Sequence, residues 1–284
     1  MALRRRSSSA PAGPAAALPP VTVSEHEGVR YLHLGSIWVQ GAMRIRKPDA
    51  IELDYVQRML AVLLWLPQDG EGERLSDGLA VQLGLGAAAI TRFTHAALGM
   101  RTIAVELNPL VINAARLWFR LPDDGERLQV LRMDALRWLR EEARPGSVRL
   151  LHVDLYDEEA AAPVLDDEDF YAACRRVLEP GGLMAVNLFG RRSSFEASAA
   201  RIAAVFGADQ VWSLRPTREG NTVVVAGQGA VVPSREELLQ RAAAIEQRFG
   251  HLDLAARSWL RMVRPWQPRA ATVGGRGARA PRSS

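Results

Sequence analysis

Short apolar runs alternate with stretches of helical periodicity from residue 79 to residue 227. The apolar runs have the length of buried strands, and the stretches between them carry apolar residues at the spacing of a helix that covers a sheet. This alternation predicts a doubly wound α/β sheet with ligands at the carboxyl ends of the strands. The predicted strands cover 79–84, 101–106, 128–131, 149–154, 181–188, 210–215 and 222–227, and the predicted helices cover 88–98, 109–120, 134–143, 167–178, 193–206 and 234–248.

The last two predicted strands are joined by a short turn over 216–221, which is typical of a hairpin. We therefore expect one antiparallel strand at that edge of the sheet. Residues 21–50 show a different pattern, in which short β-like runs at 21–23, 29–34 and 36–43 are separated by turn signals. They predict a small N-terminal β-domain with an antiparallel sheet.

A mostly buried helix is predicted over residues 51–65 and opens the large domain, which we expect to extend over 51–250. Both ends of the chain have low-complexity sequences. Residues 1–20 are rich in Arg, Ser, Ala and Pro, and the C-terminal segment 251–284 ends in a Pro-, Gly- and Arg-rich stretch. We expect the first to be a disordered tail and the second to be largely a disordered basic tail.

The positive charge of the chain lies at its ends. The first twenty residues hold three arginines and no acid, and residues 261–284 hold six arginines and no acid. Without these nine charges, the net +4 of the chain becomes −5 for residues 21–260. An acidic body argues against a specific nucleic-acid partner. No apolar run is long enough to span a membrane, and a single cysteine, Cys174, favours a reducing, cytoplasmic location without disulfides.

The first predicted strand of the large sheet runs into a glycine motif, Gly84-x-Gly86-x-x-Ala89. Gly84 permits a tight turn, Gly86 allows close approach of the backbone to a ligand, and Ala89 allows close helix–strand packing. Glu106 ends the next strand about twenty residues further on, where a carboxylate accepts hydrogen bonds from ribose hydroxyls. The pattern predicts a nucleotide or nucleoside site.

Acidic residues follow three of the predicted parallel strands. Glu106 ends the second strand, Asp134 follows the third, and Asp154 ends the fourth. Because strand ends converge on one crevice in a doubly wound sheet, we expect these carboxylates to share a ligand site. Asp134 has an alternative role, since it could cap the helix that begins at Ala135.

A second pair of carboxylates occurs in Asp154-Leu-Tyr-Asp157, on the loop that leaves the fourth strand. Two carboxylates three residues apart can bind and deprotonate an amine, one by orienting a cationic nitrogen and the other by accepting a proton. The acids at 166–169 instead suit the first turn of a helix. The five histidines show no metal-ligand spacing, so we expect no metal.

These motifs resemble the spermidine synthase (polyamine aminopropyltransferase) family over residues 21–225. The resemblance implies a small N-terminal β-domain followed by a Rossmann-like domain of the class I methyltransferase type. It implies transfer of an aminopropyl group from decarboxylated S-adenosylmethionine, as co-substrate, to a di- or polyamine. It also implies that the enzyme forms a homodimer.

The family's donor-binding residues have counterparts here. Gln40, in Trp-Val-Gln-Gly, is similar to the family's glutamine near the thioadenosine. Glu106 is similar to its ribose-binding acid. The pair Asp134-Ala135 resembles the Asp-Gly or Asp-Ala pair that reads adenine.

The family's amine-binding residues also have counterparts. Asp154 stands in the catalytic position of the Asp-x-x-Asp loop and Asp157 in its diamine-binding position. Tyr156, between them, is a further substrate-binding candidate, with orientation of Asp154 or packing in the core as alternatives. Tyr55, as a catalytic residue, and Gln57, as a substrate-binding residue, fall near the family's Tyr-(His/Gln)-Glu-Met segment.

Two departures from the family keep other functions open. The family's glycine loop reads Gly-Gly-Gly-Asp-Gly-Gly, and its aspartate binds the amine of the donor, whereas this chain has Ala87 there. The loop after Asp157 also lacks the family's Pro-x-Gly-Pro. An S-adenosylmethionine-dependent methyltransferase would need no aspartate at Ala87, and a non-catalytic nucleoside-binding module is a further alternative.

Overall fold

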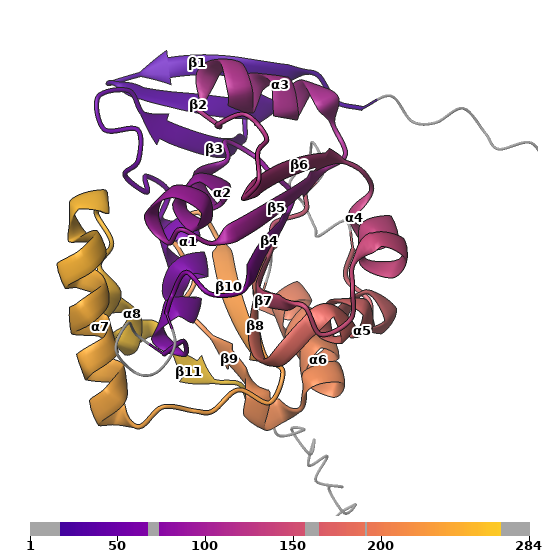
Figure 1. Ribbon diagram of the computed structural model, residues 1–284, viewed down its shortest axis with the longest axis vertical. Coiled ribbons are helices and arrows are strands. Elements are labelled where there is room, and N and C mark those ends of the chain that lie inside the picture. Colours follow the sequence, from indigo (N-terminus) through magenta and orange to yellow (C-terminus); the bar gives the residue numbers. More distant parts are fainter. Residues whose placement is uncertain (1–17, 68–73, 157–164, 191, 268–284) are drawn as a thin grey trace, which may run out of the picture.

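The structure is a computed structural model that describes residues 18–67, 74–156, 165–190 and 192–267. A small antiparallel sheet opens the chain and lies beside a large central sheet (Figure 1). In the small sheet, β2 lies between β1 and β3. Its strands are β1 (Val21–His26), β2 (Val29–Leu34) and β3 (Val39–Arg44).

The large sheet has eight strands in the order β11-β9-β10-β8-β7-β4-β5-β6. The five neighbouring strands β6, β5, β4, β7 and β8 are parallel to one another, whereas β10 is antiparallel to both β8 and β9. Its strands are β4 (Leu79–Leu83), β5 (Arg101–Glu106), β6 (Leu128–Arg132), β7 (Val148–Val153), β8 (Leu178–Phe189), β9 (Val211–Ser213), β10 (Asn221–Gly227) and β11 (Arg264–Pro265). The strand order reverses between β4 and β7, which is where ligands bind in such sheets.

Helices cover both faces of this sheet (Figure 1). Several are short, and their ends tighten into 3₁₀ turns or widen into π-helical turns. They are α1 (Asp54–Met59) with the 3₁₀ turn Leu60–Leu64, α2 (Ala89–Arg92) with the π-helical turn Phe93–Ala97, α3 (Pro109–Trp118), α4 (Ala135–Arg137) with the π-helical turn Trp138–Glu142, α5 (Glu168–Val177), α6 (Arg192–Phe206), α7 (Arg235–Phe249) and α8 (Ala256–Met262).

Local sequence explains where several helices begin. Asn108 caps α3 through a hydrogen bond from the Leu110 amide and is followed by proline, while Asp167 caps α5 through the Phe170 amide. Ser234 and Glu237 form a capping box at the start of α7. Side-chain oxygens at these positions satisfy amide groups that have no partner within the helix.

Alternating residues of the central strands divide the core into two layers. Val223 and Val225 of β10 pack with α7, α8 and the segment after α1, while Val224 and Ala226 pack with α5 and α6. A third cluster joins the small sheet to α3 and β5. This arrangement confirms the predicted doubly wound fold with a small N-terminal β-domain, and it confirms the predicted hairpin of β9 and β10.

The C-terminal region corrects one predicted boundary. The large domain extends past its predicted end at residue 250, because α8 follows, β11 pairs with β9, and the Trp266 amide donates to the carbonyl of Val211. At the other end, the Pro19 carbonyl accepts a hydrogen bond from Asn108, within the segment predicted to be disordered. The remainder of both predicted tails, 1–17 and 268–284, lies outside the described residues. Within the described residues, no helix is long and apolar enough to span a membrane.

A substitution at Gly84 tests whether the turn after β4 must pack closely against the chain after β7. Gly84 has φ +86°, and a Cβ there would lie 2.1 Å from the carbonyl oxygen of Asp154. We expect Gly84→Ala to lower the free energy of unfolding by roughly 3 kcal/mol or more, since it combines backbone strain with a backbone clash. Gly146→Ala is the control, because Gly146 also has positive φ but nothing lies within 4 Å of its Cβ position. Urea denaturation measures both, and equal losses would contradict the contact.

Candidate active site

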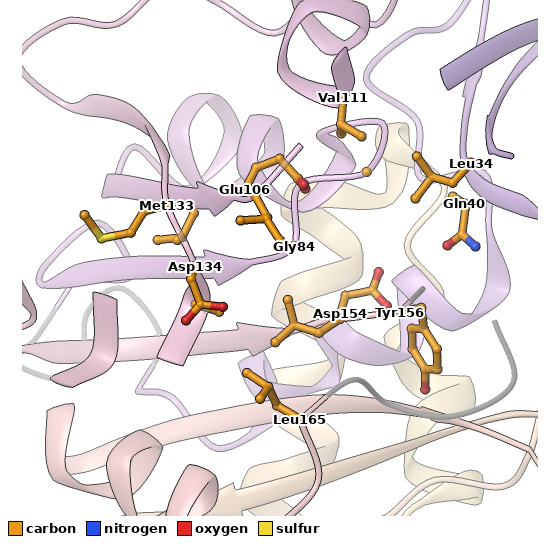
Figure 2. Close-up of a pocket in the computed structure, with 15 residues that line it drawn as sticks. Leu34, Gln40, Gly84, Glu106, Val111, Met133, Asp134, Asp154, Tyr156 and Leu165 are labelled. Carbon is orange, nitrogen blue, oxygen red and sulfur yellow. The ribbon is translucent and has the colours of Figure 1, made fainter. Parts of the chain in front are cut away.

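Three neighbouring cavities lie at the carboxyl edge of the large sheet, and Gln40 and Asp154 line all three. The first, of about 130 Å³, contains the predicted nucleoside-binding residues and is called the nucleoside cavity here (Figure 2). The second, of about 20 Å³, lies against Ala87 and Tyr55 and is called the middle cavity. The third, of about 600 Å³, is lined by aromatic and acidic side chains and is called the acceptor cavity.

The glycine motif forms one wall of the nucleoside cavity. Positive φ angles occur at Gly84, Gly86 and Ala88, so every second residue of this turn has a left-handed backbone conformation before α2 begins. A Cβ at Gly86 would lie 2.9 Å from the carbonyl oxygen of Gln40. The small residue therefore allows close approach of strand β3 of the small sheet, which the motif alone did not indicate.

Glu106 is fixed at the end of β5 by two backbone amides. One carboxylate oxygen accepts from the Leu85 amide at 2.9 Å and the other from the Asn108 amide at 2.8 Å. Burial raises the pKa of Glu106, and these amide hydrogen bonds act in the opposite direction. Each oxygen keeps a further lone pair, so the carboxylate can still accept hydrogen bonds from a ligand in the cavity.

Asp134 both caps a helix and lines the nucleoside cavity. Its Oδ1 accepts from the Arg137 amide at 2.8 Å and so caps α4, while the residue also lines the nucleoside cavity together with Ala135. Figure 2 shows Glu106, Asp134 and Asp154 around the same cavity. The three strand ends therefore converge, as the acidic pattern predicted.

Gln40 comes from the small sheet and faces the cavities from the side opposite these acids (Figure 2). Its amide nitrogen is buried and has no hydrogen-bond partner. A buried donor without an acceptor is costly, so this atom fits a ligand that supplies an acceptor.

Asp154 follows β7 and is held by two neutral donors. Asn187 of β8 donates through Nδ2 to Oδ1 at 2.9 Å, and the Tyr55 hydroxyl of α1 donates to Oδ2 at 3.1 Å. Asn221 of β10 in turn donates to the side-chain oxygen of Asn187 at 3.1 Å. The carboxylate is thus oriented by three elements, and no ion pair to it occurs among the residues that the structure describes.

The burial of this group changes its acid–base behaviour. Burial raises the pKa of Asp154, whereas the hydrogen bonds from Asn187 and Tyr55 lower it. Burial, together with the nearby Asp154 carboxylate, raises the pKa of Tyr55 well above its ordinary value, so Tyr55 stays protonated and remains a donor. A carboxylate with a raised pKa is a stronger base than an exposed one.

Acidic and aromatic side chains together line the acceptor cavity. The acids are Glu52, Asp54, Asp154 and Glu219, and the aromatic residues are Tyr31, Trp38, Tyr55, Tyr156 and Phe189. No Lys or Arg occurs among the described residues that line any of the three cavities. Carboxylates and aromatic faces both attract cations, so this surface suits a positively charged amine.

Two of the predicted amine-binding residues, Gln57 and Asp157, are not among the described residues that line the cavities. Gln57 lines none of these cavities, and its amide donates to the carbonyl of Ile51 at 3.0 Å. In a helix, residues two apart point in nearly opposite directions, so Gln57 cannot share the orientation of Tyr55. Asp157 lies outside the described residues. Tyr156 does line the acceptor cavity, and its hydroxyl donates to the Asn187 carbonyl at 2.7 Å.

Sequence reasoning did not identify Glu52, Asn221 or Glu219 as site residues. No motif marked them, and only their positions beside the strand ends bring them to the cavities. Asn187, at the end of β8, also lines the acceptor cavity, and it holds Asp154 through a hydrogen bond. The described residues contain no group of three or more His, Cys, Asp or Glu side chains that could hold a metal ion.

The fold is shared with solved structures of two enzyme classes. A probable spermidine synthase from Corynebacterium glutamicum aligns with a TM-score of 0.66 at 19% identity, over 84% of this chain and 88% of that chain. Human methyltransferase-like protein 13 aligns with a TM-score of 0.60 at 22% identity, over 78% and 98%. A spermidine synthase in complex with the transition state analogue AdoDATO aligns with a TM-score of 0.57 at 15% identity, over 84% of each chain.

Curated relatives are similar to most of the chain, although no protein-family model matches it. The polyamine aminopropyltransferase of Chromobacterium violaceum is 31% identical over 236 residues, which cover 82% of this chain and 86% of the relative. That of Neisseria meningitidis serogroup A is 30% identical over 237 residues, which cover 82% and 85%. This similarity, together with the shared fold, shows that the chain belongs to the polyamine aminopropyltransferase family.

Proposed function

We propose that this protein transfers an aminopropyl group from decarboxylated S-adenosylmethionine to a small di- or polyamine, with Asp154 as the base. The observation that carries the proposal is the position of Asp154, which lines the nucleoside, middle and acceptor cavities at once. A donor and an acceptor in adjacent cavities would meet at this carboxylate. Holding two reactants in such a geometry is itself a large part of catalysis.

The electrostatics of the cavities support cationic substrates. Both the sulfonium of the donor and the ammonium groups of the amines are positive, and the described lining carries carboxylates without Lys or Arg. Trp38 and Phe189 lie edge to face at 6.3 Å between ring centroids, and both line the acceptor cavity. Their faces can attract the alkyl ammonium of an acceptor, which also carries apolar methylene groups.

The nucleoside cavity fits the adenosyl part of the donor. Glu106 would accept hydrogen bonds from the ribose hydroxyls, and Asp134, with Ala135, would contact the adenine. Gln40 would use its buried, unpartnered amide nitrogen on an acceptor atom of the ligand. Gly84 and Gly86 would allow the loop to approach the nucleoside closely.

The reaction is then a direct displacement. Asp154 removes a proton from the attacking nitrogen, whose lone pair forms a bond to the carbon attached to the sulfonium. The carbon–sulfur bond breaks, and its electron pair remains on sulfur, which leaves as a neutral thioether. Tyr55 and Asn187 orient the base. Tyr156 and Asp157 would bind the acceptor. The family resemblance implies a homodimer, and the single cysteine favours a cytoplasmic location.

A methyltransferase is the second candidate, because Ala87 removes the carboxylate that the family uses for the donor amine. Calorimetric titration with S-adenosylmethionine, its decarboxylated form and methylthioadenosine separates the two. We expect the decarboxylated donor to bind more tightly than the intact one, since the cavities are lined by carboxylates that repel another carboxylate. Preference for intact S-adenosylmethionine would contradict aminopropyl transfer, and binding of none of the three would point to a role without this nucleoside.

Replacement of the base tests the mechanism. Asp154→Asn preserves the size of the side chain but removes its capacity to accept the proton. We expect amine transfer to fall about 10²- to 10⁴-fold, the usual contribution of a positioned general base, while methylthioadenosine affinity stays close to the wild-type value. Steady-state kinetics and calorimetry measure the two quantities. Turnover near the wild-type rate would remove Asp154 from the catalytic role.

The hydrogen bond from Tyr55 predicts a pH effect. It favours the ionised form of Asp154 and so lowers the pKa of that group. Tyr55→Phe should raise this pKa, and the acidic limb of the kcat/KM profile should move to higher pH by about half to one unit, given that a hydrogen bond contributes about 1 kcal/mol. Tyr171→Phe is the control, because the Tyr171 hydroxyl donates to Asp166 instead. An acidic limb that stays in place, or moves to lower pH, would contradict the assignment.

A further inference from the structure

The donor's primary ammonium has no charged partner in the glycine loop of this chain. Ala87 occupies the position at which the family carries an aspartate, and it is buried against Gly41, where a Cβ would lie 2.5 Å from that of Ala87. A buried ammonium without a counter-charge is costly, so a carboxylate must come from elsewhere if the proposed function holds. The inference below rests on that function.

The middle cavity is the place at which such a carboxylate is needed. It adjoins both of the other cavities, because it shares Gln40, Gly86 and Asp154 with the nucleoside cavity and Glu52, Tyr55 and others with the acceptor cavity. Its volume of about 20 Å³ accommodates one water-sized group. An ammonium head group has this size.

Only two charged side chains occur among the described residues that line the middle cavity, Asp154 and Glu52. Asp154 is oriented by hydrogen bonds from Tyr55 and Asn187 for its proposed role as the base. It must also remain available for the proton of the attacking amine. Glu52 is therefore the carboxylate left for the donor.

One carboxylate oxygen of Glu52 accepts a hydrogen bond that holds the side chain in place, and the other is available to a ligand. Arg44 donates to its Oε2, and Arg44 also donates to Asp253 at 2.6 Å, which in turn accepts from Lys47 at 2.6 Å. The positive charges of the two basic side chains in this cluster equal the negative charges of its two carboxylates. Neither Arg44 nor Lys47 lines any of the three cavities. No described donor contacts Oε1 of Glu52, so this oxygen can accept a further hydrogen bond.

We propose that Glu52 binds the primary ammonium of the aminopropyl donor in place of the aspartate that the family carries at position 87. Arg44 acts as the positioning residue for its carboxylate. The same arrangement selects the donor, because intact S-adenosylmethionine carries a carboxylate next to this ammonium, and Glu52 and Asp154 repel it. Glu52 is thus a specificity-determining residue for decarboxylated S-adenosylmethionine.

Glu52→Gln tests this assignment by calorimetric titration with decarboxylated S-adenosylmethionine and methylthioadenosine. The second ligand has the same nucleoside but no aminopropyl ammonium. We expect the substitution to weaken the decarboxylated donor tenfold to a hundredfold and to leave methylthioadenosine within twofold of wild type. It should also narrow the preference for the decarboxylated donor over the intact one.

Asp253→Asn is the matched control. It removes the other carboxylate that Arg44 contacts but keeps the charge of Glu52, so both affinities should stay within twofold of wild type. Glu52→Asp, which withdraws the carboxylate by one methylene group, should weaken the decarboxylated donor by an intermediate amount. It replaces Glu52→Gln in the comparison if that variant does not fold.

The outcomes separate this inference from the proposed function. If wild type prefers the decarboxylated donor and Glu52→Gln binds it as wild type does, the assignment of Glu52 is wrong while aminopropyl transfer stands. An equal loss for both ligands in Glu52→Gln would also overturn it, since the residue would then support the fold of the site. A wild-type preference for intact S-adenosylmethionine would refute the proposed function itself.

Discussion

The close approach of the chain after β4 to the chain after β7 is the constraint on which the site depends. The Asp154 amide donates to the Leu83 carbonyl at 2.9 Å, and the Asp154 carbonyl lies where a Cβ of residue 84 would be. Only glycine permits this contact, and it positions the Asp154 carboxylate at the reversal point of the strand order. Both the nucleoside cavity and the acceptor cavity are lined by this residue.

The second organising feature is that neutral groups satisfy the carboxylates of the site. Glu106 is held by two backbone amides, and Asp154 is held by a tyrosine hydroxyl and an asparagine amide. Such donors fix the geometry of an acid without cancelling its charge, so the attraction for a cationic ligand is retained. Glu52 has a cation beside it, but Arg44 approaches from outside the cavities.

Much of the fold could be predicted from periodicity, because the strands of a parallel sheet are buried on both faces and stand out as apolar runs. The glycine motif and the acids at 106, 134 and 154 also indicated the edge of the sheet at which the nucleoside cavity lies, since they follow strand ends directly. The predicted helix over 51–65 was less accurate. It is α1 followed by a 3₁₀ turn, and this change of helix type is not visible in a run of apolar residues. Gln57 was assigned to the site from a motif alone, whereas the direction of its side chain depends on the helix.

The sequence by itself determined the doubly wound sheet, the glycine turn and the three acids at its edge, because each is encoded within a few neighbouring residues. Only the tertiary structure decided which side chains surround Asp154 and Ala87. Tyr55, Asn187 and Glu52 come from segments far apart in the chain, and the packing of α1 and the small sheet against the strand ends brings them together. Contacts of this kind depend on the relative placement of whole elements, which local periodicity does not record.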